Sequence, residues 1–380
     1  MDWTRNITPW FATSSRYFHH DPCFCFTLTS PHPKAWRIEG ERMTLSFFQL
    51  AISLVIILIA SEIFTNALEH LGERLKISEG VTGSLFAAIG TALPETMVPI
   101  LALVAGTSAA NVNEEIGVGA ILGAPLMLST LSVFLMALAV VRRRGINGSI
   151  TPEPTGFIRD THFFLLAFVL AAIALFIPVE MKIARMGVSV LLVLLYVTYI
   201  VKTLHASKKL VAEGNGTAAD NVMFLSRVGL PTTLFTIIMQ TLIGLAVLVA
   251  GALGFIDGVA AVSEKLGISV LLLSLIIIPI ATELPEKVNG ILWIRKGKDT
   301  LALGNITGAM VFQGTILPAI GILLTPWQPR HEVLIGVFIT LSSAFWLWIN
   351  ARNKNLKVWM LFINGAFYFA YIIASISFSR

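Results

Sequence analysis

The sequence predicts an all-α membrane protein of about ten transmembrane helices, arranged as two inverted five-helix repeats. Three observations predict this fold. Hydrophobic residues make up 56% of the 380 residues and charged residues only 13%, so the chain carries more apolar surface than one water-soluble core can bury. The apolar residues form long runs. Two segments of the first half recur in the second half.

Ten of these runs are long enough to cross the roughly 30 Å hydrocarbon core of a bilayer as helices. They lie at residues 45–68, 81–105, 115–141, 161–179, 182–203, 228–256, 268–294, 300–325, 332–350 and 356–378. The fourth and fifth runs are separated only by a short segment that contains Pro178, Glu180 and Lys182. We therefore expect ten spans.

Basic residues are concentrated in alternate loops, which predicts the orientation. The rich loops carry Arg74, Lys76, Arg142, Arg143, Arg144, Arg159, Lys202, Lys208, Lys209, Arg295, Lys296, Lys298, Arg352, Lys354 and Lys357. The opposite loops carry Lys182, Arg185, Lys265 and Arg330. Because cytoplasmic loops hold the excess of lysine and arginine, the rich side is predicted to be cytoplasmic, with both chain ends outside.

Along the chain we expect a polar leader at residues 1–42, a first repeat at 43–207, a linker at 208–222 and a second repeat at 223–380. The leader lacks the apolar stretch of a signal peptide, and its basic residues would lie on the wrong side of the membrane. Translation from Met43 is therefore one hypothesis, which N-terminal sequencing of the native protein tests. The linker is polar and contains Gly214, Asn215 and Gly216, as flexible connections do.

Several classes of function are disfavoured by composition. The net charge of +5 comes from loops beside spans, without a basic stripe of the kind that binds nucleic acid. The two cysteines, Cys23 and Cys25, lie in the leader, so neither a disulfide framework nor a Cys/His metal site is expected. No span offers a nucleophile beside a base, so we expect neither an enzyme nor a cofactor.

The halves match at two places with one constant offset. Glu73-Arg-Leu-Lys-Ile-Ser78 corresponds to Glu264-Lys-Leu-Gly-Ile-Ser269, and Gly90-Thr-Ala-Leu-Pro-Glu95 corresponds to Ala281-Thr-Glu-Leu-Pro-Glu286. The matched segments are five helices apart, an odd number, so the second copy enters the membrane from the other side. Inverted repeats of this kind place a transporter's binding site near the midplane, at the interface of the repeats.

Glu95 and Glu286 lie deep inside their apolar runs, on the order of 15 to 25 Å along a helix axis. A carboxylate near the midplane is costly, so each glutamate should face a polar cavity and bind or relay a cation. The alternative is a protonated glutamate in an interhelical hydrogen bond. Recurrence of the residue in both copies argues against that alternative.

Further oxygen atoms accompany each glutamate. Pro94 and Pro285 lack the amide hydrogen that a helix needs, so each helix should break or kink and free a backbone carbonyl. Thr91 and Thr282 precede their glutamates by one turn and share their face, with back-bonding to their own helix as the alternative. Carboxylate, hydroxyl and carbonyl oxygens together suit calcium and sodium.

The paired segments, each followed by a Gly-x-x-x-Gly-Ala helix at 119–124 and 304–309, resemble the repeats of the sodium/calcium exchanger family of calcium/cation antiporters. The likeness covers nearly the whole chain from Met43. It implies an integral protein of a bacterial or archaeal plasma membrane with a central site shared by calcium and sodium. Glu95 and Glu286 would be the main ligands, with Thr91 and Thr282 beside them.

This chain differs from the family pattern at several positions. Where the family writes Gly-Thr-Ser before Leu-Pro-Glu, the third residue is Ala92 or Glu283, and two further serines are replaced by Ala124 and Ala309. Expected sodium ligands are therefore lost. Glu283 is a third carboxylate, three residues before Glu286, and repulsion between the two should favour protonation of one, as a proton-coupled exchanger requires.

Other polar residues of the spans are further candidates. Asn305 and Gln313, about two turns apart, are neutral ligand candidates, with interhelical hydrogen bonding as the alternative. Glu62 and Asn66 in the first span are interpreted as belonging to a helix end. The connector before Gly119 has no counterpart in the second half and is interpreted as a solvated loop. Its polar residues are Asn111, Asn113, Glu114 and Glu115.

The predicted function is a cation antiporter that exchanges calcium for sodium or protons by alternating access, with inorganic cations and the lipid bilayer as its partners. Two facing carboxylates match the charge of one divalent ion, which monovalent ions can replace, and such competition is the minimum that an antiporter needs. The alternatives are an exchanger of another divalent ion, such as manganese or magnesium, and a relative that no longer transports. A channel would be insensitive to a counter-ion gradient.

Overall fold

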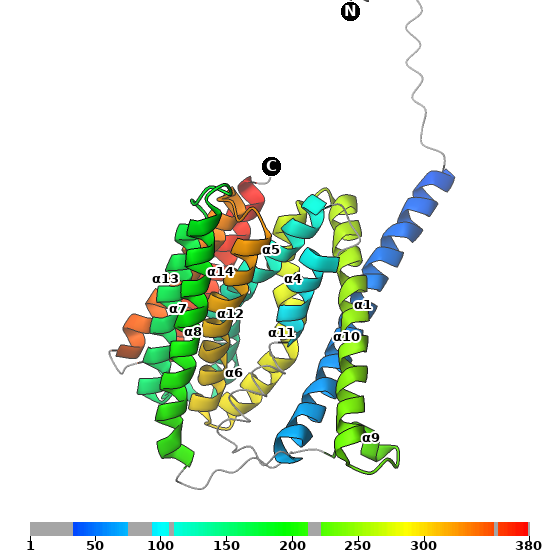
Figure 1. The fold of residues 1–380 in the computed structure, drawn as a ribbon. Helices are drawn as coiled ribbons and strands as arrows, with labels where there is room; N and C mark the ends of the chain where they lie inside the picture. The colour runs from blue at the N-terminus through cyan, green and yellow to red at the C-terminus, as the bar shows by residue number, and fades with distance from the viewer. Residues whose placement is uncertain (1–32, 75–92, 106–109, 212–221, 353–355, 379–380) are drawn as a thin grey trace, which may run out of the picture. The chain divides into compact units, whose positions relative to one another are not determined.

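The computed structural model describes residues 33–74, 93–105, 110–211, 222–352 and 356–378 (Figure 1). The chain divides into two units, Met1–Glu41 and Arg42–Arg380. Of the first unit, only the helical stretch at 33–41 is described. Within the described ranges the chain is helical, and its only strand-like pairing is an isolated bridge between Ser149 and Lys357.

The helices carry the labels of Figure 1. Their bounds are α1 (Pro33–Arg74), α4 (Leu93–Ala105), α5 (Ala110–Met127), the π-helical turn η2 (Leu128–Ser132), α6 (Val133–Arg144), α7 (Pro154–Ala174), α8 (Lys182–Val211), α9 (Phe224–Arg227), α10 (Leu234–Leu266), α11 (Val270–Arg295), α12 (Asp299–Leu324), α13 (His331–Arg352) and α14 (Val358–Phe378). Because α5, η2 and α6 follow one another without a gap, they form one helix from Ala110 to Arg144.

Eight helical segments of the described ranges are long and apolar enough to cross a membrane. Two shorter apolar stretches, Glu95–Val104 of α4 and Val270–Ile280 of α11, accompany them. Each of the ten predicted spans thus coincides with a helix, although 81–92 of the second span lie outside the described residues. The division between the fourth and fifth spans is confirmed, because α7 ends at Ala174 and α8 begins at Lys182.

Local sequence signals account for several helix ends. Glu153 caps α7, where its carboxylate accepts hydrogen bonds from the amides of Thr155 and Gly156, and Pro154 fills the first turn. Ser269 caps α11 by accepting from the amide of Leu272. Gly267 ends α10 in the left-handed conformation at φ 63°, which glycine adopts without steric cost. The turn between α10 and α11 is therefore tightly fixed.

Four expectations differ in part from the described helices. The predicted leader overlaps α1, which begins at Pro33 and continues past the predicted span to Arg74. The connector interpreted as a loop is wrong in part, because α5 begins at Ala110 and Asn111 to Glu115 lie in its first turns. The predicted linker begins inside α8, which continues to Val211, and 212–221 lie outside the described residues. Of the break or kink expected at Pro285, the break is wrong, since α11 is continuous there.

Each half contributes a helix that packs against helices of the other half. The helix formed by α5, η2 and α6, which belongs to the first half, packs against α13 and α14 of the second half. Its counterpart α12, in the second half, packs against α7 and α8 of the first half, and α7, α8 and α12 run side by side in Figure 1. This reciprocal arrangement is what two inverted copies of one five-helix unit produce.

Three hydrophobic clusters hold the described helices, and the smallest of them lies between α1 and α10. The largest one joins α5, α6, α7 and α8 with α11, α12, α13 and α14 through residues such as Phe164, Phe168 and Tyr371. The second joins α1, α4, α5, α10 and α11 through residues such as Val98 and Ile278. Helices α4 and α11, which carry the paired Leu-Pro-Glu segments, therefore share one cluster.

Candidate functional site

Helices α5 and α11 approach each other closely beside the Leu-Pro-Glu segment of α11. A Cβ atom added at Gly119 would lie 2.5 Å from Ser274 Cβ, and one added at Gly123 would lie 2.7 Å from Pro279 Cγ and still nearer the carbonyl oxygen of Leu275. Only residues without a side chain fit here. Small residues allow helix backbones to approach in this way in membranes, so the first Gly-x-x-x-Gly pair fixes α11 against α5.

Glu95 lies on α4, and 3% of its surface is exposed. Glu95 is positioned one turn before Val98, a member of the cluster that joins α4 to α11.

Glu283 lies on α11 between two partners. Its side chain is 1% exposed, its Oε2 lies 3.2 Å from the Nζ of Lys287, and its Oε1 accepts a hydrogen bond of 2.9 Å from the amide Nε2 of Gln313 on α12. Lys287 is also buried, with 3% of its side chain exposed. The structure therefore brings together two predicted site residues, Glu283 and Gln313, with a lysine that the sequence reasoning did not include.

The remaining predicted ligands are less closely defined. Glu286 belongs to α11, one residue before Lys287, but its side chain is outside the described part of the structure. Thr282 is buried, and its hydroxyl donates to the carbonyl oxygen of Ile278 at 3.0 Å. This is the back-bonded alternative, which leaves the hydroxyl oxygen able to accept or to bind a cation. Thr91 lies outside the described residues.

Asn305 and the polar residues of the first span occupy different surroundings. Asn305 lies half-buried on α12 and, among the described residues, makes no hydrogen bond that joins it to Glu283. Asn66 is buried, and its Oδ1 accepts from the amide of Phe224 and from Gln240 on α10. Asn66 therefore ties α1 to α9 and α10. Glu62 is exposed on α1.

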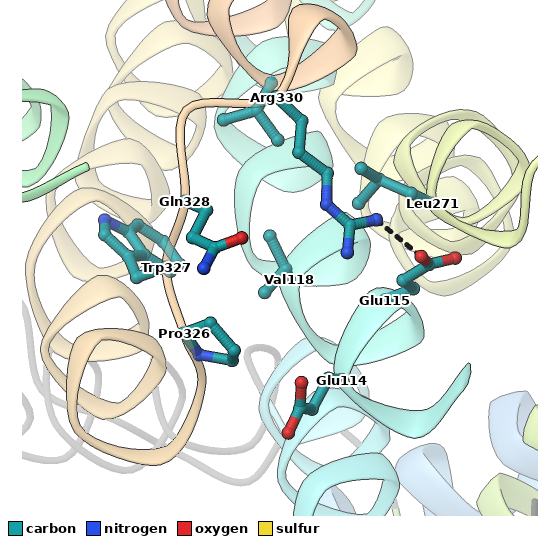
Figure 2. A pocket seen from close by; sticks show the side chains of 9 residues that line it. Glu114, Glu115, Val118, Leu271, Pro326, Trp327, Gln328 and Arg330 are labelled. Atoms are coloured by element: carbon teal, nitrogen blue, oxygen red, sulfur yellow. Dashed lines mark hydrogen bonds and ion pairs between the residues drawn. The ribbon is translucent and has the colours of Figure 1, made fainter. Parts of the chain in front are cut away.

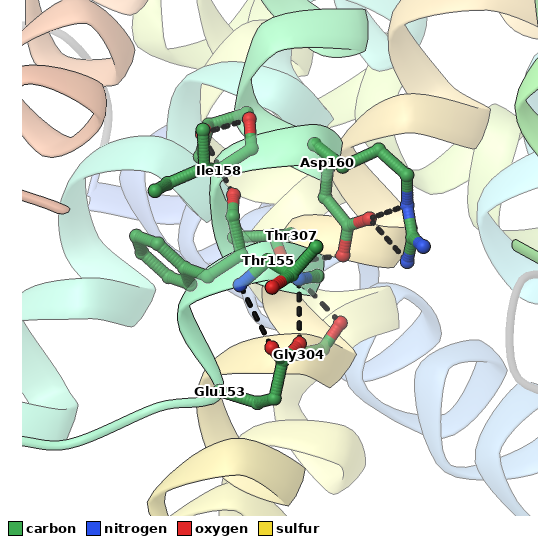
Figure 3. Close-up of polar contacts among 10 residues, drawn as sticks. Glu153, Thr155, Ile158, Asp160, Gly304 and Thr307 are labelled. Carbon is green, nitrogen blue, oxygen red and sulfur yellow. Dashed lines mark hydrogen bonds and ion pairs between the residues drawn. The ribbon is translucent and has the colours of Figure 1, made fainter. Parts of the chain in front are cut away.

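A further buried carboxylate, Asp160 on α7, contacts α12 (Figure 3). Its Oδ2 accepts a hydrogen bond of 3.0 Å from the hydroxyl of Thr307, and its Oδ1 lies 3.3 Å from Nη2 of Arg159. Thr307 lies on the same helix as Gln313. Asp160 thus holds in place the helix that donates to Glu283.

The predicted cytoplasmic loops meet in the structure. Asp299, the first residue of α12, accepts two hydrogen bonds of 2.7 Å from Arg144 and one of 2.9 Å from the amide of Thr151. Arg143 donates to the carbonyl of Arg295. Backbone hydrogen bonds also join residues 146–150 to 356–359. Three loops that the basic residues assign to one side therefore lie together.

On the side predicted to face away from the cytoplasm, residues at the start of α5 and in the α12–α13 loop line a small pocket of about 30 Å³. Figure 2 shows Arg330, from the loop after α12, reaching Glu115 of α5 to form an ion pair, with Glu114 close by. Arg185 of α8 donates to the carbonyl oxygens of Ile322, Thr325 and Pro326. These contacts tie the start of α5 and of α8 to the α12–α13 loop.

Sequence reasoning passed over Lys287 and Asp160. The signal for Lys287 was present, because a glutamate four residues before a lysine on one helix face pairs with it. The expected repulsion between Glu283 and Glu286 took no account of that positive charge. Asp160 lies close to the start of its span, where a carboxylate is not unusual, so only the fold shows that it is buried against α12.

Comparison with known proteins gives one matching family. The model of the sodium/calcium exchanger protein family matches residues 45–204 and 236–377. These two ranges cover most of the chain, and one lies within each predicted repeat. Among the described residues, no three histidine, cysteine, aspartate or glutamate side chains come together as a resident metal centre.

Among curated proteins, the inner membrane protein YrbG of Escherichia coli is 26% identical over 85% of this chain and 95% of its own length. The putative antiporter CaxA of Alkalimonas amylolytica is 25% identical over 72% of this chain and 79% of its own length. With its apolar helices, this likeness marks the chain as an integral membrane protein of the prokaryotic plasma membrane.

Among solved structures, the H⁺/Ca²⁺ exchanger CAX superposes with a TM-score of 0.64, at 17% identity, over 87% of this chain and 86% of that chain. The sodium-calcium exchanger NCX_Mj superposes with a TM-score of 0.54, at 20% identity, over 87% of this chain and 98% of that chain. At such identities the likeness shows the fold, which confirms the predicted all-α architecture of two repeats.

Proposed function

Because the chain belongs to the sodium/calcium exchanger protein family, we propose that it exchanges calcium for sodium or protons across the membrane by alternating access. Membership supports a cation exchanger, since the family consists of exchangers. The observation that carries the choice of a divalent ion is the pair of buried glutamates on α4 and α11, Glu95 and Glu283. Glu286 follows the latter three residues later in the sequence. Buried carboxylates in spans mark ion pathways.

The proposed site takes its oxygen atoms from both halves. Glu95 comes from the first half, and Glu286, Glu283 and Thr282 come from the second, with Gln313 and Asn305 on α12 as neutral ligands. Thr91 completes the set by its match to Thr282. Hard oxygen ligands of this kind suit calcium and, with fewer charges, sodium or magnesium. No cofactor is part of the proposal.

The choice of coupling ion is argued from the hydroxyl groups that the proposed site lacks. Ala92, Ala124 and Ala309 stand where the family pattern has hydroxyls, so fewer oxygen atoms are present to replace the hydration shell of sodium. A proton needs only a carboxylate oxygen. The composition of this site therefore favours protons over sodium as the ion exchanged for calcium.

Calcium uptake into proteoliposomes tests the proposal. Vesicles containing the purified protein are given an outward proton gradient, an outward sodium gradient or no gradient, and uptake of calcium-45 is measured. We expect uptake under the proton gradient, abolished by Glu95→Gln, because the neutral amide no longer binds the ion. Uptake under the sodium gradient alone would assign sodium as the coupling ion.

Three results would contradict calcium exchange. Uptake that is equal with and without a gradient would indicate a channel. Absence of uptake under both gradients, in protein that still takes up manganese or magnesium, would indicate another divalent ion. Protein that neither transports nor binds any of these ions would be a relative that no longer transports.

A further inference from the structure

The helix formed by α5, η2 and α6 changes its winding near its middle. Residues Leu128–Ser132 form the π-helical turn η2, and Pro125, which has no amide hydrogen to donate, lies just before it. Turns of this kind are rare and frequently lie at functional sites. Within the described ranges, η2 is the only π turn. It is therefore the place where this spanning helix departs from regular α-helical bonding.

The π turn lies at the depth of the candidate site. At three glycines of α5 and α11, an added Cβ atom would lie within 3.1 Å of a side chain of the other helix. These contacts join Gly119 to Ser274, Gly123 to Pro279 and Gly290 to Met136. They show that α11 runs in the same direction as the α5–α6 helix. Because η2 lies midway between the second and third contacts, it is level with residues 282–286 of α11, which carry the predicted ligands.

Two side chains of the second half bind the backbone of η2. The carbonyl oxygen of Ser129 accepts a hydrogen bond of 2.6 Å from the hydroxyl of Ser343 on α13 and one of 2.8 Å from Nδ2 of Asn364 on α14. Asn364 also donates to the hydroxyl oxygen of Ser343 at 2.7 Å. A carbonyl oxygen has two lone pairs, so these two donors satisfy Ser129 without an amide of its own helix. Asn364 and Ser343 therefore hold the π turn.

A donor and an acceptor beside these bonds are unused. The carbonyl oxygen of Ser129 can only accept, so Nδ2 of Asn364 must face it and Oδ1 must point elsewhere. Among the described residues, Oδ1 of Asn364 and the hydroxyl of Ser132 make no hydrogen bond, although both side chains are 0% exposed. Ser132 follows Ser129 by three residues and is its neighbour on the helix surface. A second arrangement, in which Ser132 donates to Oδ1 of Asn364, would satisfy both atoms.

Holding the helices together does not explain this cluster. Polar side chains do join spans to one another, but α14 already approaches α6 closely at Gly365, where an added Cβ atom would lie 2.5 Å from Phe134. A buried polar cluster stabilises a fold most when all its atoms are paired, and each unpaired atom is costly. Two unpaired groups that could bond to each other are instead what an element with two arrangements shows in one of them.

We propose that η2 is a switch in the exchange cycle and that Asn364 is the residue that positions it. In one state Asn364 donates to the carbonyl of Ser129, as it does here. In the other state Ser132 donates to Oδ1 of Asn364, and the carbonyl of Ser129 returns to an amide of its own helix. The winding at η2 then changes, and with it the direction of α5 relative to α6. The proposal rests on the exchange proposed above, for which it supplies a bistable element at the depth of the site.

The test compares the wild-type protein with Ser132→Ala, Asn364→Leu and the control Asn350→Leu. Asn350 is also a buried asparagine, but it donates to the carbonyl of Trp346 in its own helix. Three quantities are measured for each protein. They are the melting temperature in detergent, the equilibrium binding of calcium-45 by the purified protein, and the rate at which internal calcium-45 exchanges for external unlabelled calcium in proteoliposomes.

Ser132→Ala should keep the melting temperature and the calcium affinity of the wild type, because its hydroxyl has no partner in this state. It should slow exchange by about threefold to tenfold, the effect of losing one hydrogen bond from the other state. Asn364→Leu should slow exchange at least as much and also lower the melting temperature, because it loses the hydrogen bonds of both states. Asn350→Leu should exchange calcium at the wild-type rate.

Exchange by Ser132→Ala at the wild-type rate would overturn the proposal. So would a fall in its melting temperature as large as that of Asn364→Leu, since the hydroxyl of Ser132 would then already be bonded in this state. The melting comparison needs no transport, so it tests the switch even in a variant that does not exchange. A wild type that neither binds nor exchanges calcium would contradict the proposed exchange instead, so the two failures are distinguishable.

Discussion

At the residue scale, Glu283 holds two partners at once. Lys287 contacts one carboxylate oxygen from the same helix, and Gln313 donates to the other from α12. A carboxylate with both oxygens engaged can remain ionised in a buried place.

The hydrogen bond from Gln313 should contribute to stability. Leucine at this position has a similar size but no donor, so Gln313→Leu leaves a buried carboxylate oxygen without its partner. Hydrogen bonds to charged groups contribute about 1.5 to 3 kcal/mol, and we expect a loss of that size in the free energy of unfolding, measured in detergent. Asn305→Leu on the same helix serves as the control and should cost less. Equal losses would contradict the assignment of Gln313 as the partner of Glu283.

At the element scale, α5 and α11 are held at short distance by Gly119 and Gly123. Helix α12 is held separately, by Asp299 at its start and by Thr307 in its first half. The two helices that carry Glu283 and Gln313 are thus each fixed by further contacts besides the hydrogen bond between them. Their relative position is set by packing rather than by the pair of side chains alone.

The glycine contact predicts a selective effect of alanine. At Gly123 a Cβ atom meets the backbone of α11, which cannot move aside without shifting the helix. Overpacking of this kind costs about 1 to 3 kcal/mol, so Gly123→Ala should lower both the melting temperature in detergent and the rate of calcium uptake. Gly187→Ala on α8, where nothing lies within 4 Å, should be neutral or stabilise the protein by up to about 1 kcal/mol. Similar destabilisation by both would contradict the close approach.

The cap of α7 predicts a pH dependence. Partial burial raises the pKa of Glu153, but the amides of Gly156 and Thr155 and the charge of Arg159 outweigh burial and hold the pKa below its ordinary value. A carboxylate with a lowered pKa stabilises the fold above its unfolded pKa, about 4.3, and loses this contribution as pH falls through the folded pKa.

Glu153→Ala should therefore reduce the free energy of unfolding by about 1 kcal/mol at pH 7, as loss of a helix cap does. The difference from wild type should shrink below pH 4. Melting curves in detergent between pH 3 and pH 7 measure it. A difference that stays constant over this range would show that the charge of Glu153 has no part in the cap.

At the scale of the whole molecule, the sequence was sufficient for the spans and the repeat, because length and apolar composition decide which segments can cross a bilayer. It was not sufficient for the start of α5, because the polar residues Asn111 and Glu114 predicted a loop, whereas both lie in the helix. It also could not place Lys287 or Asp160, since burial depends on neighbours that are distant in the chain. Thr91 and the side chain of Glu286 remain predictions.

The orientation of the molecule is testable by labelling. In a version with Cys23 and Cys25 changed to serine, single cysteines replace the exposed residues Lys182 or Lys296. A maleimide that does not cross membranes should label Lys182→Cys in intact spheroplasts and Lys296→Cys only after permeabilisation, because basic loops stay in the cytoplasm. Labelling of both from the same side would contradict the predicted topology.

Calcium countertransport tests the central claim, that this chain is an antiporter, without assuming its coupling ion. Proteoliposomes loaded with calcium-45 in sodium-free, alkaline buffer, where both proposed counter-ions are scarce, are diluted into the same buffer with chelator or with unlabelled calcium. The account predicts that the label leaves much faster when external calcium is present, and that Glu95→Gln abolishes this calcium-dependent efflux. Efflux of the label at the same rate into both media would contradict it, because an antiporter without a counter-ion to bind cannot return.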